Sequence, residues 1–337
     1  MQKKTGRKVD PPRSIDVAAL AGVSRSAVSR TFTKGASVSP ATREKVMRAA
    51  EALGYRPNML ARTLITRRSG IVGLVISDVL NPFYAGALEA LSRHLQDRDF
   101  SPLLFCCRDA RHLDELIPKV LSYQVDGVVI AAATLSSTMA RECAKAGRPV
   151  VLVNRYTDSG EASSVACDNV MAGRMAAEHL LAAGRRAIAF IAGLENTSSS
   201  RDRELGLTRA LAAHGLAPVA RESGNYAYND ALDAARRILS RPQRPDAIFC
   251  ANDVMALAVL DVARSEFGLE TPRDLAVVGV DNISAAAWPS YALTTVDQNV
   301  ERMSAEAISV LIERIDDHAS LPVRRLIPPS LCVRDTA

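Results

Sequence analysis

The chain has 337 residues, a length that predicts two or three domains, and its 48% hydrophobic and 23% charged content is ordinary for a globular protein. It contains no run of 18 apolar residues, and no apolar segment lies between the basic N-terminus and Pro11. We therefore expect neither a membrane span nor a secretory signal. The six scattered cysteines include no Cys-x-x-Cys pair, which favours reduced thiols in a cytoplasmic protein without a zinc site, and no cofactor is expected.

The net charge of +5 is unevenly distributed along the chain. Residues 1–70 contain 15 Lys and Arg against 4 Asp and Glu, a net charge of +11, which leaves −6 for the remainder. A basic first fifth on an acidic body indicates a polyanionic partner at one end of the protein. A solvated basic tail would explain Lys3, Lys4, Arg7 and Lys8, but not the arginines inside the helices predicted next.

The first predicted helix lies in the stretch IDVAALAG, residues 15–22. Ser14 can cap a helix that starts at Ile15, and Gly22 tolerates the left-handed backbone that ends one. Helical spacing predicts a buried face formed by Val17, Leu20 and Ala21.

A second helix is predicted after Ser24, which can serve as its N-cap. One face of this helix is polar and contains no acid; it consists of Arg25, Ser26, Ser29, Arg30 and Thr33. The residues left for the inside are Val23, Val28 and Phe32.

A third helix is predicted to start at Pro40 with Ser39 as its cap and to stop at Gly54. Its buried residues are expected to be Val46, Ala49 or Ala50, and Leu53. Two short helices joined by a glycine turn, with a third packed behind, follow the helix-turn-helix plan, in which the second helix enters the major groove. Arginine can bind a guanine edge with two hydrogen bonds, and serine can bind bases or phosphates. A plain three-helix bundle is the alternative, but it gives no reason for an acid-free face of Arg and Ser.

The segments DVAALAGVSRSAVSRTF and VSPATREKVMRAAEALGYRPNMLARTL resemble the N-terminus of the lactose-repressor/galactose-repressor family of bacterial transcription regulators. The resemblance continues over nearly the whole chain, and it implies that the acid-free face of the second helix contacts the operator. Two departures affect the expected DNA contacts. Family members commonly begin the first helix with Thr-Ile-Lys-Asp, where this sequence has RSID at residues 13–16, and Thr33 stands where Asn is common.

The segment GYRPNMLARTLITRRSG joins the basic module to the acidic body. A helix from Asn58 to Leu64 is too short to be stable alone, so a frayed tether is one reading. The resemblance implies instead a hinge helix that orders on DNA, pairs with its copy in a second subunit and inserts a leucine into the minor groove. The DNA contacts implied for this segment are Asn58, Ala61 and Leu64.

From Gly70 onward, apolar runs such as IVGLVIS, GVVIAA and AIAFIAG alternate with helix-like segments such as YAGALEALSRHLQ. This alternation predicts an α/β fold with parallel sheets, and the length suits two doubly wound halves. The resemblance implies a periplasmic-binding-protein-like body that crosses between subdomains near residues 168–171, 295–300 and 321–327. The expected boundaries are 13–57 for the helix-turn-helix module, 58–68 for the hinge helix and 70–337 for the effector-binding body, whose subdomains cover about 70–168 with 297–324 and about 170–295 with 325–337.

Polar residues follow several predicted strands, at the edge where parallel sheets bind ligands. A strand followed by Asp or Asn is also common without a ligand, because both residues cap helices. The resemblance implies a sugar or a related small metabolite between the subdomains, and the guanidinium of Arg203 and the carboxylate of Asp281 suit vicinal hydroxyls. The other residues implied for this site are Phe83, Tyr84, Asn154, Ser199, Tyr226 and Asn252. Asp253 is either a further ligand or a helix cap, and Asp281 has a purely structural reading as well. Arg155, Arg201 and Arg203 would allow an acidic sugar, but arginines at such a site also occur with neutral sugars.

These features predict a homodimeric transcription regulator, expected to be a repressor, that binds a palindromic double-stranded DNA operator and responds to a small effector. A solute-binding protein for transport would share the body but would have no use for the basic module. An enzyme is not expected, because the sequence contains no GxGxxG after a strand, no GxxxxGK[ST] and no activated nucleophile.

Overall fold

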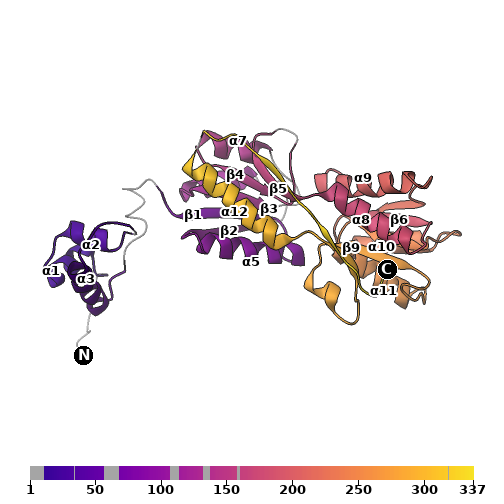
Figure 1. Cartoon of the computed structure of the whole chain (residues 1–337), viewed down its shortest axis with the longest axis horizontal. Helices are drawn as coiled ribbons and strands as arrows, with labels where there is room; N and C mark the ends of the chain where they lie inside the picture. The colour runs from indigo at the N-terminus through magenta and orange to yellow at the C-terminus, as the bar shows by residue number, and fades with distance from the viewer. Residues whose placement is uncertain are drawn as a thin grey trace, which may run out of the picture. The chain divides into compact units, whose positions relative to one another are not determined.

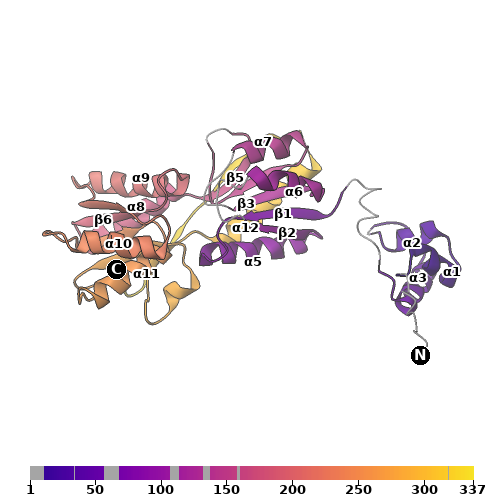
Figure 2. The same ribbon diagram turned by 180° about the vertical axis from the view of Figure 1, so that it is seen from behind.

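The computed structural model describes residues 11–33, 35–56, 68–106, 114–131, 137–157, 160–317 and 319–337. The chain divides into two compact units, Met1–Ser69 and Gly70–Ala337. Figures 1 and 2 show them from opposite sides.

The described residues of the first unit form three helices, α1 (Ser14–Ala21), α2 (Arg25–Thr31) and α3 (Pro40–Leu53). The Ser24 and Ser39 hydroxyls cap α2 and α3, and Gly22 and Gly54 end α1 and α3 in the left-handed conformation. The core that joins the three helices consists of Val17, Ala18, Val28, Val46, Ala49 and Ala50. Val23 and Phe32 pack against this core as partly buried residues.

Three details of the first unit differ from the sequence prediction. The N-cap of α1 is Arg13 rather than Ser14, and the Arg13 backbone N–H donates to the Asp16 carboxylate at 2.7 Å. Leu20 and Leu53 are exposed rather than buried. In α1 the buried alanine is Ala18, whereas the predicted Ala21 is only partly buried. Short helices permit several apolar stripes, so spacing alone did not select the correct one.

The second unit contains two six-stranded sheets. The first sheet is entirely parallel, in the order β11-β5-β4-β3-β1-β2. Its strands are β1 (Ile71–Ile76), β2 (Ser101–Cys106), β3 (Gly127–Ala131), β4 (Val150–Val153), β5 (Ser163–Cys167) and β11 (Arg324–Ile327). Its helices are α5 (Pro82–Gln96), α6 (Ile117–Ser122), α7 (Ser137–Lys145) and α12 (Val300–Asp316). The 3₁₀ helix Asp114–Leu116 precedes α6.

Alternate residues of the first sheet face different helices, as expected for strands covered on both faces. Leu74 and Val129 belong to the core that α5 and α12 share, whereas Val75 and Val128 pack with residues of α6 and α7. In Figure 1 the yellow helix α12, near the end of the chain, lies among the purple and magenta elements of the first half of the body.

The second sheet has the order β12-β10-β9-β8-β6-β7, and its β10–β12 pair is antiparallel. Its strands are β6 (Ile188–Ala192), β7 (Ala220–Ser223), β8 (Ala247–Cys250), β9 (Ala276–Val280), β10 (Thr294–Asp297) and β12 (Ser330–Cys332). Its helices are α8 (Asn169–Ala182), α9 (Ser198–Ala212), α10 (Tyr228–Leu239) and α11 (Asp253–Ser265), and the 3₁₀ helix Ser284–Ala287 follows β9. The two sheets with their helices form the two subdomains, and the predicted fold class is confirmed.

The chain passes between the subdomains after β5, after β10 and after β11. The third passage lies later in the chain than the predicted boundary between residues 324 and 325. Residues Arg324–Ile327 pair with β5 in the first sheet, so the passage occurs at Pro328 and Pro329. Proline lacks the N–H that a sheet requires, which explains why pairing with the first sheet stops there.

Candidate functional site

Helix α2 presents a polar face that the described residues of the first unit leave exposed. Arg25, Ser26, Ser29 and Arg30 are exposed, and the helix contains no acidic residue. Its opposite face supplies the buried Ala27, Val28 and Thr31. The exposed side chains are therefore free to bind a groove while the helix stays anchored in the core, which suits a recognition helix.

Thr33 differs from the other residues predicted for this face. It is half-buried, and its hydroxyl donates to the Ser29 carbonyl at 2.9 Å. From α3, the Arg43 guanidinium donates to the Thr31 carbonyl at 2.9 Å and so satisfies the end of α2. Asn58, Ala61 and Leu64, together with the predicted hinge helix, lie outside the described residues.

A second group of polar residues lies where the two subdomains of the body meet; we call it the inter-subdomain site. From the first subdomain, α5 supplies the buried Phe83 and Tyr84, whose rings meet edge to face at 5.3 Å. Arg155 follows β4 and lies beside Tyr84, and its guanidinium is 5.3 Å from the centre of the Tyr226 ring of the second subdomain. Burial raises the pKa of the Tyr84 hydroxyl, and Arg155 opposes this shift.

Arg203 is the largest fully buried side chain in the described part of the protein. Its Nε donates to the Asn169 carboxamide at 2.8 Å, and its Nη1 donates to the Ala251 carbonyl. Arg203 can lie here because α8 and α9 approach closely at two glycines. A Cβ at Gly173 would lie 2.0 Å from the Arg203 carbonyl oxygen, and one at Gly206 would lie 2.1 Å from the Val170 carbonyl oxygen.

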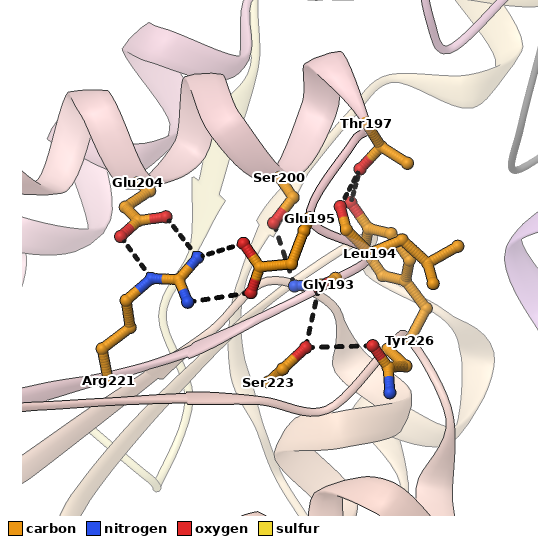
Figure 3. A network of polar contacts seen from close by, with 10 residues as sticks. Gly193, Leu194, Glu195, Thr197, Ser200, Glu204, Arg221, Ser223 and Tyr226 are labelled. Atoms are coloured by element: carbon orange, nitrogen blue, oxygen red, sulfur yellow. Dashed lines mark hydrogen bonds and ion pairs between the residues drawn. The ribbon is translucent and has the colours of Figure 1, made fainter.

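Tyr226 is held against the start of α9. Its hydroxyl is 3.0 Å from the Ser199 hydroxyl and 3.3 Å from the Thr197 hydroxyl. Figure 3 shows Tyr226 beside Thr197 and Gly193. Gly193 is required there, because a Cβ would lie 2.1 Å from the tyrosine ring.

Ion pairs of Arg221 at the surface hold the other end of this hydrogen-bond network. Arg221 binds Glu195 at 2.7 Å and Glu204 at 2.6 Å, so it ties β7 to the loop before α9 and to α9 itself (Figure 3). The Ser200 hydroxyl accepts from the Gly193 backbone N–H at 3.0 Å. Both contacts fix the loop on which Tyr226 rests.

Two buried carboxyls follow strands of the second sheet. Asp281 follows β9 and accepts a hydrogen bond from the Gln298 amide at 2.5 Å, and burial raises its pKa to about 8 although Arg203 opposes this effect. Asp253 accepts from the Thr295 hydroxyl at 2.5 Å and from the Ile283 backbone N–H at 3.0 Å. Burial raises the pKa of Asp253 to about 6. Both carboxylate oxygens of Asp253 thus accept hydrogen bonds within the second subdomain, so this residue stabilises the subdomain itself.

Asn252, predicted to bind ligand, is the N-cap of α11, since its side-chain oxygen accepts from the Met255 backbone N–H at 3.0 Å. The alternative that Asp253 caps this helix is therefore wrong. Asn154 is buried after β4, and its side-chain oxygen has no partner.

Several polar atoms of the inter-subdomain site are buried without a hydrogen-bond partner. They are Asn154 Oδ1, Arg155 Nε and Nη1, Arg203 Nη2 and Gln298 Oε1. Three residues of the site also have left-handed φ angles: Asn154 at 67°, Tyr226 at 61° and Asp281 at 131°. Unsatisfied buried polar groups and strained backbone angles both cost free energy, and both are typical of ligand-binding sites.

The sequence gives weak signals for two members of this site. Arg155 is the second residue after an apolar strand. The sequence indicates only that it would allow an acidic sugar. Gln298 lies in the passage between subdomains and carries no motif. Within the described ranges, no group of three or more His, Cys, Asp or Glu side chains could hold a metal ion. No helix in those ranges is long and apolar enough to cross a membrane.

A DNA-reading module joined to a two-subdomain binding body defines a ligand-responsive DNA-binding transcription regulator. Residues 15–58 match the lacI family of bacterial regulatory proteins, and residues 177–337 match the periplasmic binding protein-like domain. The chain is 36% identical to the HTH-type transcriptional regulator CelR of Thermobifida fusca, over 95% of this chain and 96% of that protein. It is 32% identical to the ribose operon repressor of Escherichia coli, over 96% and 98% of the two chains. The chain therefore belongs to the lacI family, and the resemblance inferred from the sequence is confirmed.

Solved structures agree with this assignment. A CelR–cellobiose complex superposes with a TM-score of 0.75 at 34% identity, covering 97% of this chain and all of that one. The lac repressor dimer bound to operator and the anti-inducer ONPF superposes with a TM-score of 0.86 at 26% identity, covering 97% and 99% of the two chains.

Proposed function

We propose that this protein is a homodimeric repressor that binds a palindromic operator through α2 of each subunit. The exposed, acid-free face of α2 supports this proposal, with Arg25 and Arg30 as base or phosphate contacts and Ser26 and Ser29 beside them. The solved lac repressor dimer on its operator supports the two-fold arrangement, because a two-fold protein pairs naturally with a palindromic site.

The switch that we propose is a sugar or a sugar derivative bound at the inter-subdomain site. One observation carries this proposal. Arg155 and Arg203 have buried donors, and Asn154 and Gln298 have buried acceptors, that lack a hydrogen-bond partner. A bound polyhydroxylated molecule would satisfy these atoms and would stabilise one relative orientation of the subdomains. A ligand that binds one orientation better shifts the population toward it and so alters operator affinity.

The test begins with selection of binding sites from random double-stranded DNA by the full-length protein. A palindromic consensus is expected. Fluorescence anisotropy on the selected site, repeated with neutral sugars, sugar acids and sugar phosphates, should then identify a compound that changes the operator Kd. Absence of a selected consensus would overturn the DNA-reading role, whereas a consensus whose affinity no compound alters would overturn the sugar switch.

A further inference from the structure

Arg155 is a buried cation without an ion pair. Its side chain lies inside the inter-subdomain site at 4% exposure, and its Nε and Nη1 have no hydrogen-bond partner. No carboxylate of the described residues forms an ion pair with it. The Tyr84 and Tyr226 side chains contact it, and Asp281 interacts with it only at longer range. A buried charge is costly unless it is paired, so the unpartnered Nε and Nη1 of this guanidinium are suited to an acceptor on a bound molecule.

The acidic residue of the site is a weak counter-charge. Burial raises the pKa of Asp281 to about 8, although Arg203 and Arg155 oppose this shift, so ionisation of its carboxyl is disfavoured. Arg203 adds a second guanidinium, whose hydrogen-bond partners, the Asn169 carboxamide and the Ala251 carbonyl, are both neutral and whose Nη2 is unpartnered. Two buried guanidiniums therefore lie in a site whose one acid, Asp281, is buried and resists ionisation.

The remaining free groups indicate the rest of the ligand. Asn154 Oδ1 and Gln298 Oε1 are buried acceptors without a donor, and hydroxyl groups would supply the missing hydrogens. These acceptors and Arg155 have different requirements, since the acceptors need O–H donors and the cation needs an anion.

We propose that the effector is a polyhydroxylated molecule with one oxyanion, a carboxylate or a phosphate, and that Arg155 binds this oxyanion. This inference rests on the proposed function and specifies its ligand class. A guanidinium binds either anion with two parallel hydrogen bonds, so the two sources share the recognition chemistry. A neutral sugar would satisfy the hydroxyl-binding atoms but would leave the Arg155 charge uncompensated.

Isothermal titration of the full-length protein with matched compounds tests this inference. For glucose, galactose, ribose and cellobiose, the neutral sugar is compared with its aldonic acid and with its terminal phosphate. We expect one acid or phosphate to bind at least about tenfold more tightly than its neutral parent, the size typical of a hydrogen bond to a charged group. The acid and phosphate arms identify which oxyanion is preferred.

Three variants make the result specific to Arg155. Arg155→Met should abolish the preference for the charged compound, and Arg155→Lys, which keeps the charge, should retain part of it even if the Met variant does not fold. Arg209→Met removes an exposed arginine from α9 and should leave the preference unchanged. Binding of neutral sugars only, binding of no charged compound, or an unchanged preference in folded Arg155→Met would overturn the inference. If a neutral sugar also changes operator affinity, the proposed function stands although this inference fails.

Discussion

The Tyr156 hydroxyl donates a hydrogen bond of 2.7 Å to the Asp202 carboxylate, and this contact joins the two subdomains. Tyr156 follows β4 of the first subdomain, whereas Asp202 lies on α9 of the second. The Arg324 guanidinium lies 3.3 Å from the centre of the Tyr156 ring, which orients the phenol. The Tyr156 backbone N–H also approaches the Ser198 hydroxyl at 3.4 Å. Tyr156 therefore connects the two subdomains directly.

Tyr156→Phe should weaken this connection. The variant removes one hydrogen bond to a charged group that is half-buried, and we expect a loss of about 1 kcal/mol in the free energy that favours the present arrangement. Urea unfolding should detect the loss as a lower midpoint. Titration with any compound that the wild type binds should show a weaker Kd by about fivefold, since 1.4 kcal/mol corresponds to tenfold.

Tyr123→Phe is the matched control for this experiment. Tyr123 is half exposed and contacts the Phe105 ring, and no hydrogen bond of its hydroxyl occurs among the described residues. This variant should leave both the urea midpoint and the Kd unchanged. An identical loss in the two variants would mean that the Tyr156 hydroxyl does not connect the subdomains.

Arg30→Ala should reduce discrimination between the selected operator and random DNA without unfolding the first unit. Arg30 is exposed and lies outside the core of that unit. A bidentate contact to a base is worth about 1–3 kcal/mol of discrimination. Anisotropy titrations on both DNAs measure this difference, and Arg48→Ala on α3, another exposed arginine, serves as control. An equal loss on both DNAs would indicate a phosphate contact instead of base reading.

Local signals explain why the helices of the first unit could be predicted from the sequence. Ser24 and Ser39 cap their helices as expected, and Gly22 and Gly54 end theirs. The apolar runs of the body likewise become central strands, such as β1 and β6, because strands buried on both faces must be continuously apolar. The strand β11 escaped prediction because RRLI at the edge of the sheet is mostly exposed and polar.

The inter-subdomain site could be predicted only in part. Arg203, Tyr226 and Asp281 follow from the family resemblance, but Arg155 meets Tyr226 from the other subdomain, 71 positions along the chain. Such a contact depends on how the two subdomains are oriented, which no local pattern encodes. The missing counter-charge of Arg155 is similarly a property of its surroundings and not of its sequence neighbours.

Gly206→Ala should destabilise the body by about 1–3 kcal/mol, the range found when a tightly packed interface receives an extra methyl group. The new Cβ would lie 2.1 Å from the Val170 carbonyl oxygen, and this is backbone that cannot rotate away. Separation of α8 from α9 would also displace Arg203. Gly86→Ala is the control, because nothing lies within 4 Å of a Cβ at this position of α5 and alanine favours helix. Urea unfolding should show destabilisation in the first variant and none in the second.

Asp281→Asn should reduce the pH dependence of stability between about pH 4 and pH 8. Burial raises the pKa of Asp281 from 3.8 to about 8, so in this range the folded protein keeps a proton that the unfolded chain has lost. The contribution of this carboxyl is therefore fully present below pH 3.8 and is lost as the pH rises through about 8. Asparagine cannot ionise, so the variant should not share this loss. Urea unfolding at pH 5 and pH 8 measures the difference, and Asp233→Asn, at an exposed carboxylate paired with Arg236, should behave as wild type. A wild-type protein that gains stability relative to Asp281→Asn toward pH 8 would show that Asp281 is ionised in the folded state, in which case Arg155 and Arg203 already have their counter-charge.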